Sequence, residues 1–214
     1  VKERSGCRIL LAQKAFSMYS CYPLLAEYLD GSAASGLYEA RLGREEFGKE
    51  THVFSPAYRE DEFGEILSYA DHIVFNSPSQ VERYGRLAKQ AGKSIGLRIN
   101  PECSTQEGHA IYDPCAPGSR LGTTLENFQE EQMELLDGFH FHTLCEQNSD
   151  ALEVTVAAVE EKFGRWLPGL KWLNLGGGHH ITRPDYDRER LIRIIRHLKE
   201  TYHVEVYLEP GEAV

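Results

Sequence analysis

The amino-acid sequence predicts an α/β protein, specifically a closed (β/α)8 barrel of the TIM type. Short apolar runs alternate with amphipathic stretches of helical length along nearly the whole chain. This alternation is typical of buried parallel strands that are connected by helices. The chain shows no repeat, linker or low-complexity stretch, so we expect one large domain over residues 1–214. The rhythm favours a barrel, and a doubly wound open sheet is the alternative fold.

The predicted elements follow one another in the order that a barrel requires. The apolar runs predict strands at 8–13, 32–35, 51–54, 72–76, 94–100, 138–143, 171–175 and 205–208. The amphipathic stretches predict helices at 23–29, 37–47, 60–70, 78–91, 150–163 and 187–202. The segment 101–131 breaks the rhythm, since it is long and rich in Pro and Gly. We expect it to be a functional or mobile loop.

Composition limits the possible partners and the cellular location. Charged residues make up 26% of the chain and the formal net charge is −10. This balance argues against nucleic acid as a partner and fits a cationic substrate, or solubility alone. No apolar run reaches the roughly 18 residues of a membrane helix, and there is no signal-peptide pattern, so we expect a cytoplasmic protein without a membrane partner. The 5 Cys are irregularly spaced, which indicates reduced thiols rather than disulfides or a zinc site.

A lysine ends the first predicted strand. Lys14 follows the run Ile9-Leu10-Leu11-Ala12-Gln13, and the C-terminal ends of barrel strands carry function. A lysine amine that is partly desolvated there would lose its proton and become able to form a Schiff base. An ordinary lysine that reaches into solvent is the alternative.

Two histidines alternate on the sixth predicted strand. His140 and His142 are two positions apart, so both side chains can point into the barrel. Inward histidines can also be hydrogen-bonded core residues without a function. A polar segment, 144–148, follows them and suits the rim of a binding site.

A glycine triplet follows the seventh predicted strand. Gly176, Gly177 and Gly178 allow the backbone to approach a ligand, and their N–H groups can hold a phosphate. The loop after the seventh strand of a barrel is a common phosphate position. His179 and His180 come next, but no carboxylate or cysteine is spaced to complete a metal site with them, so we predict no metal.

The eighth predicted strand ends at Glu209-Pro210-Gly211-Glu212. A carboxylate at this position would point at the barrel mouth, although Pro-Gly is also ordinary turn chemistry. Lys14, His142, the glycine triplet and Glu209 together match what pyridoxal phosphate (PLP) needs. These needs are an amine, a flat stacking partner, a phosphate site and an acid for the pyridine nitrogen.

The chain resembles the alanine-racemase-like, fold type III PLP enzymes, and among them the carboxynorspermidine (carboxyspermidine) decarboxylases. The residues that carry this resemblance form five runs, 11–17, 112–122, 141–146, 174–182 and 208–213. The Lys and Gly-rich runs are general to the superfamily. His142-Thr143-Leu144-Cys145-Glu146 and Gly177-Gly178-His179-His180-Ile181-Thr182 are much more specific.

The resemblance implies a role for each matching residue. Lys14 would bind PLP covalently, His142 would stack on the ring, and Glu209 would pair with the pyridine nitrogen. The three glycines, with Gly211, would complete the cofactor site. Glu212 stands where related ornithine-type enzymes have Arg, and its negative charge would suit a polyamine substrate. Arg98 and Arg120 are weaker candidates for supporting the site.

The resemblance also implies decarboxylation of carboxynorspermidine or carboxyspermidine to norspermidine or spermidine, in a homodimer with shared sites. The family has a C-terminal β domain, which brings a cysteine and an acid to the partner's site, and a segment before the first strand. Both are missing from this chain, so we expect a barrel that is truncated and inactive by itself. The alternatives are another fold III enzyme (a diaminopimelate, ornithine or arginine decarboxylase, or a racemase), a non-enzymatic PLP-binding homeostasis barrel, and a barrel without PLP.

Overall fold

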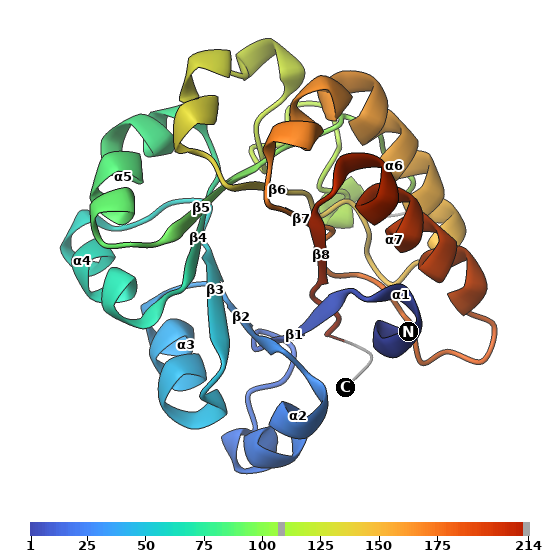
Figure 1. Cartoon of the computed structure of the whole chain (residues 1–214), viewed down its shortest axis with the longest axis horizontal. Coiled ribbons are helices and arrows are strands. Elements are labelled where there is room, and N and C mark those ends of the chain that lie inside the picture. Colours follow the sequence, from blue (N-terminus) through green and yellow to red (C-terminus); the bar gives the residue numbers. More distant parts are fainter. Residues whose placement is uncertain (107–109, 212–214) are drawn as a thin grey trace.

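Eight parallel strands close into a ring in chain order (Figure 1), in a computed structural model that describes residues 1–106 and 110–211. The first strand pairs with both the second and the eighth, so the predicted barrel is confirmed and the open sheet is wrong. The strands are β1 Arg8–Ala12, β2 Gly31–Ala34, β3 Glu50–Phe54, β4 His72–Phe75, β5 Ser94–Arg98, β6 Gly138–His140, β7 Trp172–Asn174 and β8 Glu205–Leu208.

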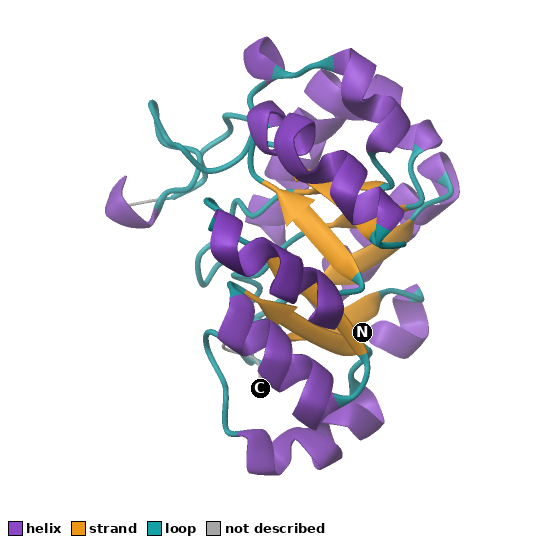
Figure 2. Cartoon of the chain, turned by 90° about the vertical axis from the view of Figure 1, so that its left-hand side faces the viewer, coloured by secondary structure: helices purple, strands orange, loops and turns teal. Residues whose placement is uncertain are grey.

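Helices surround the strands on the outside (Figure 2). They are α1 Lys2–Ser5, α2 Tyr22–Tyr28, α3 Leu37–Leu42, α4 Glu60–Tyr69, α5 Pro78–Gln90, α6 Ser149–Phe163 and α7 Arg188–Tyr202. All six predicted helices are present, and a π-helical segment, η2 Gly43–Phe47, completes the connection between β2 and β3. Sequence signals explain the helix starts. Proline occupies the first position of α5, and the Asp187 carboxylate accepts the N–H of Arg190 at the start of α7.

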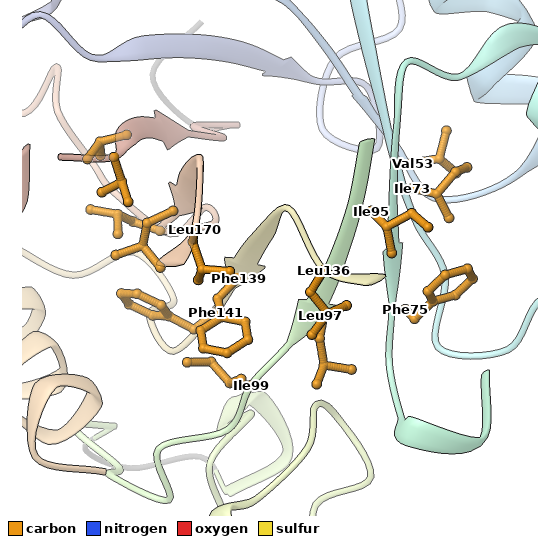
Figure 3. Close-up of a cluster of buried hydrophobic side chains, with 14 of the residues drawn as sticks. Val53, Ile73, Phe75, Ile95, Leu97, Ile99, Leu136, Phe139, Phe141 and Leu170 are labelled. Carbon is orange, nitrogen blue, oxygen red and sulfur yellow. The ribbon is translucent and has the colours of Figure 1, made fainter. Parts of the chain in front are cut away.

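The main hydrophobic core lies between the strands and the helices. Alternate strand residues point outward and pack together there, including Val53, Ile73, Ile95, Leu97 and Phe139 (Figure 3). All of these side chains are buried. This layer fixes the register of each strand, because a shift of one residue would turn its apolar side chains toward the barrel interior.

The interior of the barrel is filled at its N-terminal end by Trp172. An added Cβ at Gly96 would lie 2.2 Å from this indole, and one at Gly138 would lie 2.1 Å from it. The two glycines on β5 and β6 therefore make room for the tryptophan of β7. His52 and Tyr207 pack beside it in the same layer, so side chains close this end of the barrel.

An aspartate precedes three of the even-numbered strands and repeats one interaction. Asp30, Asp71 and Asp137 each accept a backbone N–H of the preceding odd-numbered strand, from Ile9, Thr51 and Ile95 respectively, at 2.9 Å. Each carboxylate also pairs with a lysine or an arginine. These aspartates tie neighbouring strands together at the end opposite the candidate site.

The connection between β5 and β6 contains no α-helix in the residues that the structure describes. It consists of loops and three short 3-10 segments, η3 Ala110–Tyr112, η4 Leu125–Asn127 and η5 Glu130–Leu135, and the part around η3 extends away from the barrel (Figure 2). Buried amides hold its base. Asn76 bonds to Arg120 and Gly122, and Asn100 bonds to Leu121. None of the helices formed by the described residues has the length and apolar content needed to span a lipid bilayer.

Candidate functional site

The candidate residues that the structure describes follow strands, at the C-terminal end of the barrel. Lys14 follows β1, His142 follows β6, the glycine triplet follows β7 and Glu209 follows β8. Parallel strands in a closed barrel place these positions around one opening. Glu212, predicted to bind substrate, lies outside the described residues.

Glu209 is an ionised carboxylate in a mostly buried position. Its side chain is 15% exposed, and its Oε2 lies 3.7 Å from His140 Nε2. Asn174 Nδ2 donates to Glu209 Oε1 at 2.7 Å. Burial opposes ionisation, but the interactions with His140 and Asn174 outweigh it and lower the pKa of this carboxyl to about 2. The group is therefore a fixed negative charge at the barrel mouth.

His140 points into the barrel, as the alternation of residues predicts. It is 1% exposed and its ring stacks on Phe54 of β3, with centroids 5.4 Å apart. Burial lowers the pKa of His140, although Glu209 acts in the opposite direction. The geometry assigns the proton to Nε2, which faces Glu209. Nδ1 has no hydrogen-bond partner among the described residues.

His142 lies beyond the strand that was predicted to contain it. Strand β6 ends at His140, because only Gly138–His140 pair with both neighbouring strands. The Phe141 N–H still donates to Asn174 O at 2.9 Å, so the chain keeps its direction. The Gly177 N–H approaches His142 Nδ1 at 3.4 Å. Burial and the nearby positive charge of Arg98 lower the pKa of His142 to about 3, so its ring is neutral, and its Nδ1 edge faces the glycine loop.

Arg98 is a buried cation at the end of β5. It is 5% exposed, its guanidinium lies 4.8 Å from the Phe54 ring centroid, and Nη2 donates to His142 O at 3.2 Å. Burial lowers its pKa to about 10, which leaves it charged at neutral pH. Arg120, the second arginine candidate, is exposed. Only its backbone oxygen has a hydrogen bond among those described, from Asn76.

The glycine loop packs against two neighbouring loops. Gly176 and Gly178 have φ of 68° and 79°, in the left-handed region that favours glycine. An added Cβ would lie 2.6 Å from Phe141 O at Gly176 and 2.3 Å from Leu144 O at Gly178. The main chain therefore requires these glycines whether or not a ligand is bound.

Lys14 is exposed, which corrects the expectation of a partly desolvated amine. Strand β1 ends at Ala12, and Lys14 lies in the turn that follows, where it reaches solvent. Gly211 packs against this turn, since an added Cβ would lie 2.7 Å from Ala15 Cβ. The preceding Gln13 points the other way, is 1% exposed, and donates to Glu39 O at 2.9 Å. The turn thus brings Lys14 next to the loop that follows Glu209.

A pocket of about 740 Å³ lies between the β5–β6 loop, the β6–α6 loop and the start of α6, and its lining residues include none of Lys14, His142, Gly178 and Glu209. Gln147 joins the two loops. Its side chain accepts from Gln106 at 2.6 Å and donates to Thr105 O at 2.7 Å, and its backbone N–H donates to Gly178 O at 3.0 Å. The polar rim that the sequence predicts at 144–148 is therefore connected to both flanking loops.

Sequence reasoning missed Asn174, which is 0% exposed and contacts both Glu209 and Gly176. The signal was an amide in the otherwise apolar run Trp172-Leu173-Asn174-Leu175. The structure also brings His140, His142 and Glu209 together, with side-chain nitrogen and oxygen atoms within 4.8 Å of one another. Neither His179 nor His180 belongs to such a group among the described residues.

Comparisons with known proteins find decarboxylases that are similar to this chain over its whole length. It is 45% identical over 214 residues to a carboxynorspermidine/carboxyspermidine decarboxylase of Campylobacter jejuni subsp. jejuni serotype O:6. It is 41% identical over 215 residues to a carboxyaminopropylagmatine decarboxylase of Synechocystis sp.. Both alignments cover 100% of this chain and 55% of the relative, so the chain spans about half the length of these relatives. No family model matches the chain.

Solved structures of decarboxylases are also similar to this chain. The crystal structure of carboxynorspermidine decarboxylase from Campylobacter jejuni, complexed with norspermidine, superposes with a TM-score of 0.90 at 44% identity. The match covers 99% of this chain and 54% of that one. Diaminopimelate decarboxylase from Helicobacter pylori, complexed with L-lysine, has a TM-score of 0.80 at 18% identity, covering 100% of this chain and 58% of that one. At that identity the likeness shows the barrel fold alone.

Proposed function

Because the chain is a homologue, over its whole length, of the carboxynorspermidine and carboxyspermidine decarboxylases, we propose that residues 1–214 are the PLP-binding barrel domain of such an enzyme. The reaction is PLP-dependent decarboxylation of carboxynorspermidine or carboxyspermidine to norspermidine or spermidine. The observation that carries this proposal is the 39–45% identity to such enzymes over all of the chain. The cytoplasm is the expected location.

The residues at the barrel mouth fit PLP. Glu209 is ionised and mostly buried, which suits a partner for a protonated pyridine nitrogen. His142 supplies a neutral, flat ring, and Gly178 lets the main chain come close in a left-handed conformation. Lys14 provides an amine on the adjacent turn. When bound, PLP supplies an electron sink for the electron pair that CO₂ leaves behind at Cα.

Each residue then has one task. Lys14 would hold the cofactor through its side-chain amine. The Glu209 carboxylate keeps a proton on the ring nitrogen through its negative charge. His142 would pack against the face of the cofactor ring and exclude water from it. The buried guanidinium of Arg98 holds the His142 carbonyl and so positions the residue that packs against the ring.

The glycine loop binds the phosphate through its later residues. The Gly176 N–H already donates to Asn174 Oδ1 at 2.9 Å, and the Gly177 N–H is directed at His142 Nδ1. These two glycines therefore shape the loop, with Gly211 supporting the adjacent turn. We therefore assign phosphate binding to the backbone of the loop at Gly178.

The substrate is a polyamine-like amino acid with several positive charges. The formal net charge of −10 would attract such a cation, and Glu212 is the acid we assign to its distal amines. The active enzyme is a homodimer in which the second subunit completes each site. Neither nucleic acid nor a membrane is a partner.

A second substrate has support from one relative. The Synechocystis enzyme, at 41% identity over the whole chain, is named for carboxyaminopropylagmatine, which carries a guanidino group in place of a terminal amine. The two substrates are distinguished by adding each to the PLP-loaded protein and measuring how readily it displaces the cofactor from Lys14. If carboxyaminopropylagmatine displaces the cofactor from Lys14 more readily, it is the substrate, and the proposed reaction is still a decarboxylation.

The test of the cofactor assignment is the site of covalent attachment. The chain is mixed with PLP, reduced with borohydride and analysed by peptide mass spectrometry, with Lys14→Ala as the first variant and Lys49→Ala as the matched control on another exposed lysine. We expect the reduced adduct on Lys14 alone, and its loss only in Lys14→Ala. Attachment distributed over many lysines, with no preference for Lys14, would contradict the proposal.

A further inference from the structure

Asn174 connects the two halves of the candidate site through both ends of its amide. Its Nδ2 donates to Glu209 Oε1 at 2.7 Å, and its Oδ1 accepts the Gly176 N–H at 2.9 Å. The backbone closes the loop, because the Glu209 N–H donates to Gly176 O at 2.8 Å. These three hydrogen bonds join the end of β8 to the start of the glycine loop.

The position of Asn174 makes these bonds obligatory. The side chain is 0% exposed, and a buried amide without partners destabilises a protein. Leu173 and Leu175, its apolar neighbours in the chain, point outward into the core. Asn174 points inward with His140, its register partner on β6. The amide therefore has a single orientation, which places its N–H group against Glu209.

We propose that Asn174 is a positioning residue, which keeps Glu209 ionised and holds its carboxylate at a fixed place relative to the first glycine of the loop. The proposal rests on the proposed function, since it gives PLP one side chain that orders both its ring-nitrogen partner and its phosphate loop. The amide is required because an aspartate of the same size would direct a second carboxylate at Glu209. Repulsion between the two would drive a proton onto one of them.

The charged and titratable groups around Glu209 determine how the test is read. His140 and His142 face it from the β6 side, and Arg98 is the nearby cation of β5. None of these groups is altered by a substitution at Asn174. A change in the titration of Glu209 in Asn174→Ala therefore reports the lost N–H donor, whereas the change in Asn174→Asp reports the lost donor together with the added carboxylate.

The experiment is a carbon-13 NMR titration of the glutamate side chains in the cofactor-free chain, with Glu209→Gln used for assignment. In the parent chain we expect Glu209 to titrate well below an ordinary glutamate. In Asn174→Asp we expect its midpoint to rise by at least one pH unit, about a tenfold change in proton affinity. Asn174→Ala, which removes the donor without adding a charge, should raise it by a smaller amount.

Asn76→Asp is the matched control. Asn76 is also a buried amide that follows a barrel strand, donates to one carbonyl and accepts one N–H, but it follows β4, which does not neighbour β8. We expect Asn76→Asp to leave the Glu209 midpoint unchanged. An unchanged midpoint in folded Asn174→Asp and Asn174→Ala would overturn the proposal.

A second measurement separates this inference from the proposed function. PLP affinity of the same variants is measured by fluorescence, and we expect Asn174→Asp to bind about tenfold more weakly than the parent, in line with the shift in proton affinity. If the parent chain binds no PLP while the Glu209 midpoint still moves, the proposed function fails and the positioning role stands. If PLP binds and the midpoint stays fixed, the positioning role fails alone.

Discussion

At the scale of single residues, the glycine triplet shows how packing and binding can require the same residue. Gly178 has a left-handed backbone, and Leu144 O would lie 2.3 Å from its Cβ. Gly118 has nearly the same backbone, with φ of 76°, but its Cβ would meet nothing within 4 Å. Substitution of alanine at the two glycines therefore separates two losses of stability, one caused by the left-handed conformation and one caused by the close approach of another backbone.

We expect Gly178→Ala to lower the free energy of unfolding by more than 3 kcal/mol, about twice the loss for Gly118→Ala. The left-handed conformation alone costs an alanine about 1–2 kcal/mol, and at Gly178 the methyl group also overlaps a backbone carbonyl that cannot move freely. Urea unfolding followed by circular dichroism measures both losses. Equal losses would show that the Leu144 loop yields and that close approach is not the reason for the glycine.

At the scale of elements, the aspartates before β2, β4 and β6 give the barrel a repeat of two strands. The three sites differ in burial, because the Asp137 side chain is 7% exposed and the Asp71 side chain is 37% exposed. Asp137 pairs with both Lys89 and Lys171, at 2.6 and 2.8 Å. Although burial alone would raise its pKa, the two lysines and the Ile95 N–H lower it. The carboxylate therefore stabilises the fold above its unfolded pKa and loses this effect as the pH falls.

Asp137→Asn should cost more stability than Asp71→Asn. Hydrogen bonds to a charged group contribute about 1.5–3 kcal/mol, and exposed ion pairs contribute at most about 1 kcal/mol. We expect a loss of about 2–3 kcal/mol for the first variant and about 1 kcal/mol for the second, measured by urea unfolding at neutral pH. A larger loss for Asp71→Asn would mean that burial does not determine the strength of these strand ties.

At the scale of the whole molecule, the order of elements was predictable from sequence because each strand is an isolated apolar run. Closure of the sheet and the grouping of His142, Gly178 and Glu209 followed from that order. The exposure of Lys14 was not predictable, because it depends on where β1 ends. The role of Asn174 was not predictable either, because its partners come from the next strand and from its own loop.

Buried histidines make the stability of the whole barrel dependent on pH. Burial lowers the pKa of His72 and of His142 to about 3, whereas in the unfolded chain histidine titrates near pH 6.5. Between these values the unfolded chain binds more protons, so acidification favours unfolding. We expect the free energy of unfolding to fall from pH 7 to pH 5, by at most about 1.4 kcal/mol per pH unit for each histidine.

Urea unfolding at pH 7, 6 and 5 measures this dependence. His72→Phe keeps a flat ring against His52 but cannot take up a proton, so it should weaken the dependence and leave the contributions of His140 and His142. A free energy that stays constant over this range in the parent chain would contradict the prediction.

The tryptophan that packs over Gly96 and Gly138 affects how a bound molecule can enter and leave the barrel. Trp172 is 3% exposed, and its Nε1 donates to Ser94 Oγ at 2.8 Å, so the described side chains leave it no room to swing aside. A molecule bound beside Glu209 and His142 therefore cannot pass through the N-terminal end of the barrel, and we expect it to enter and leave at the C-terminal end. A second molecule can then bind only after the first has been released. A segment that covers the C-terminal opening would therefore limit the rate of exchange.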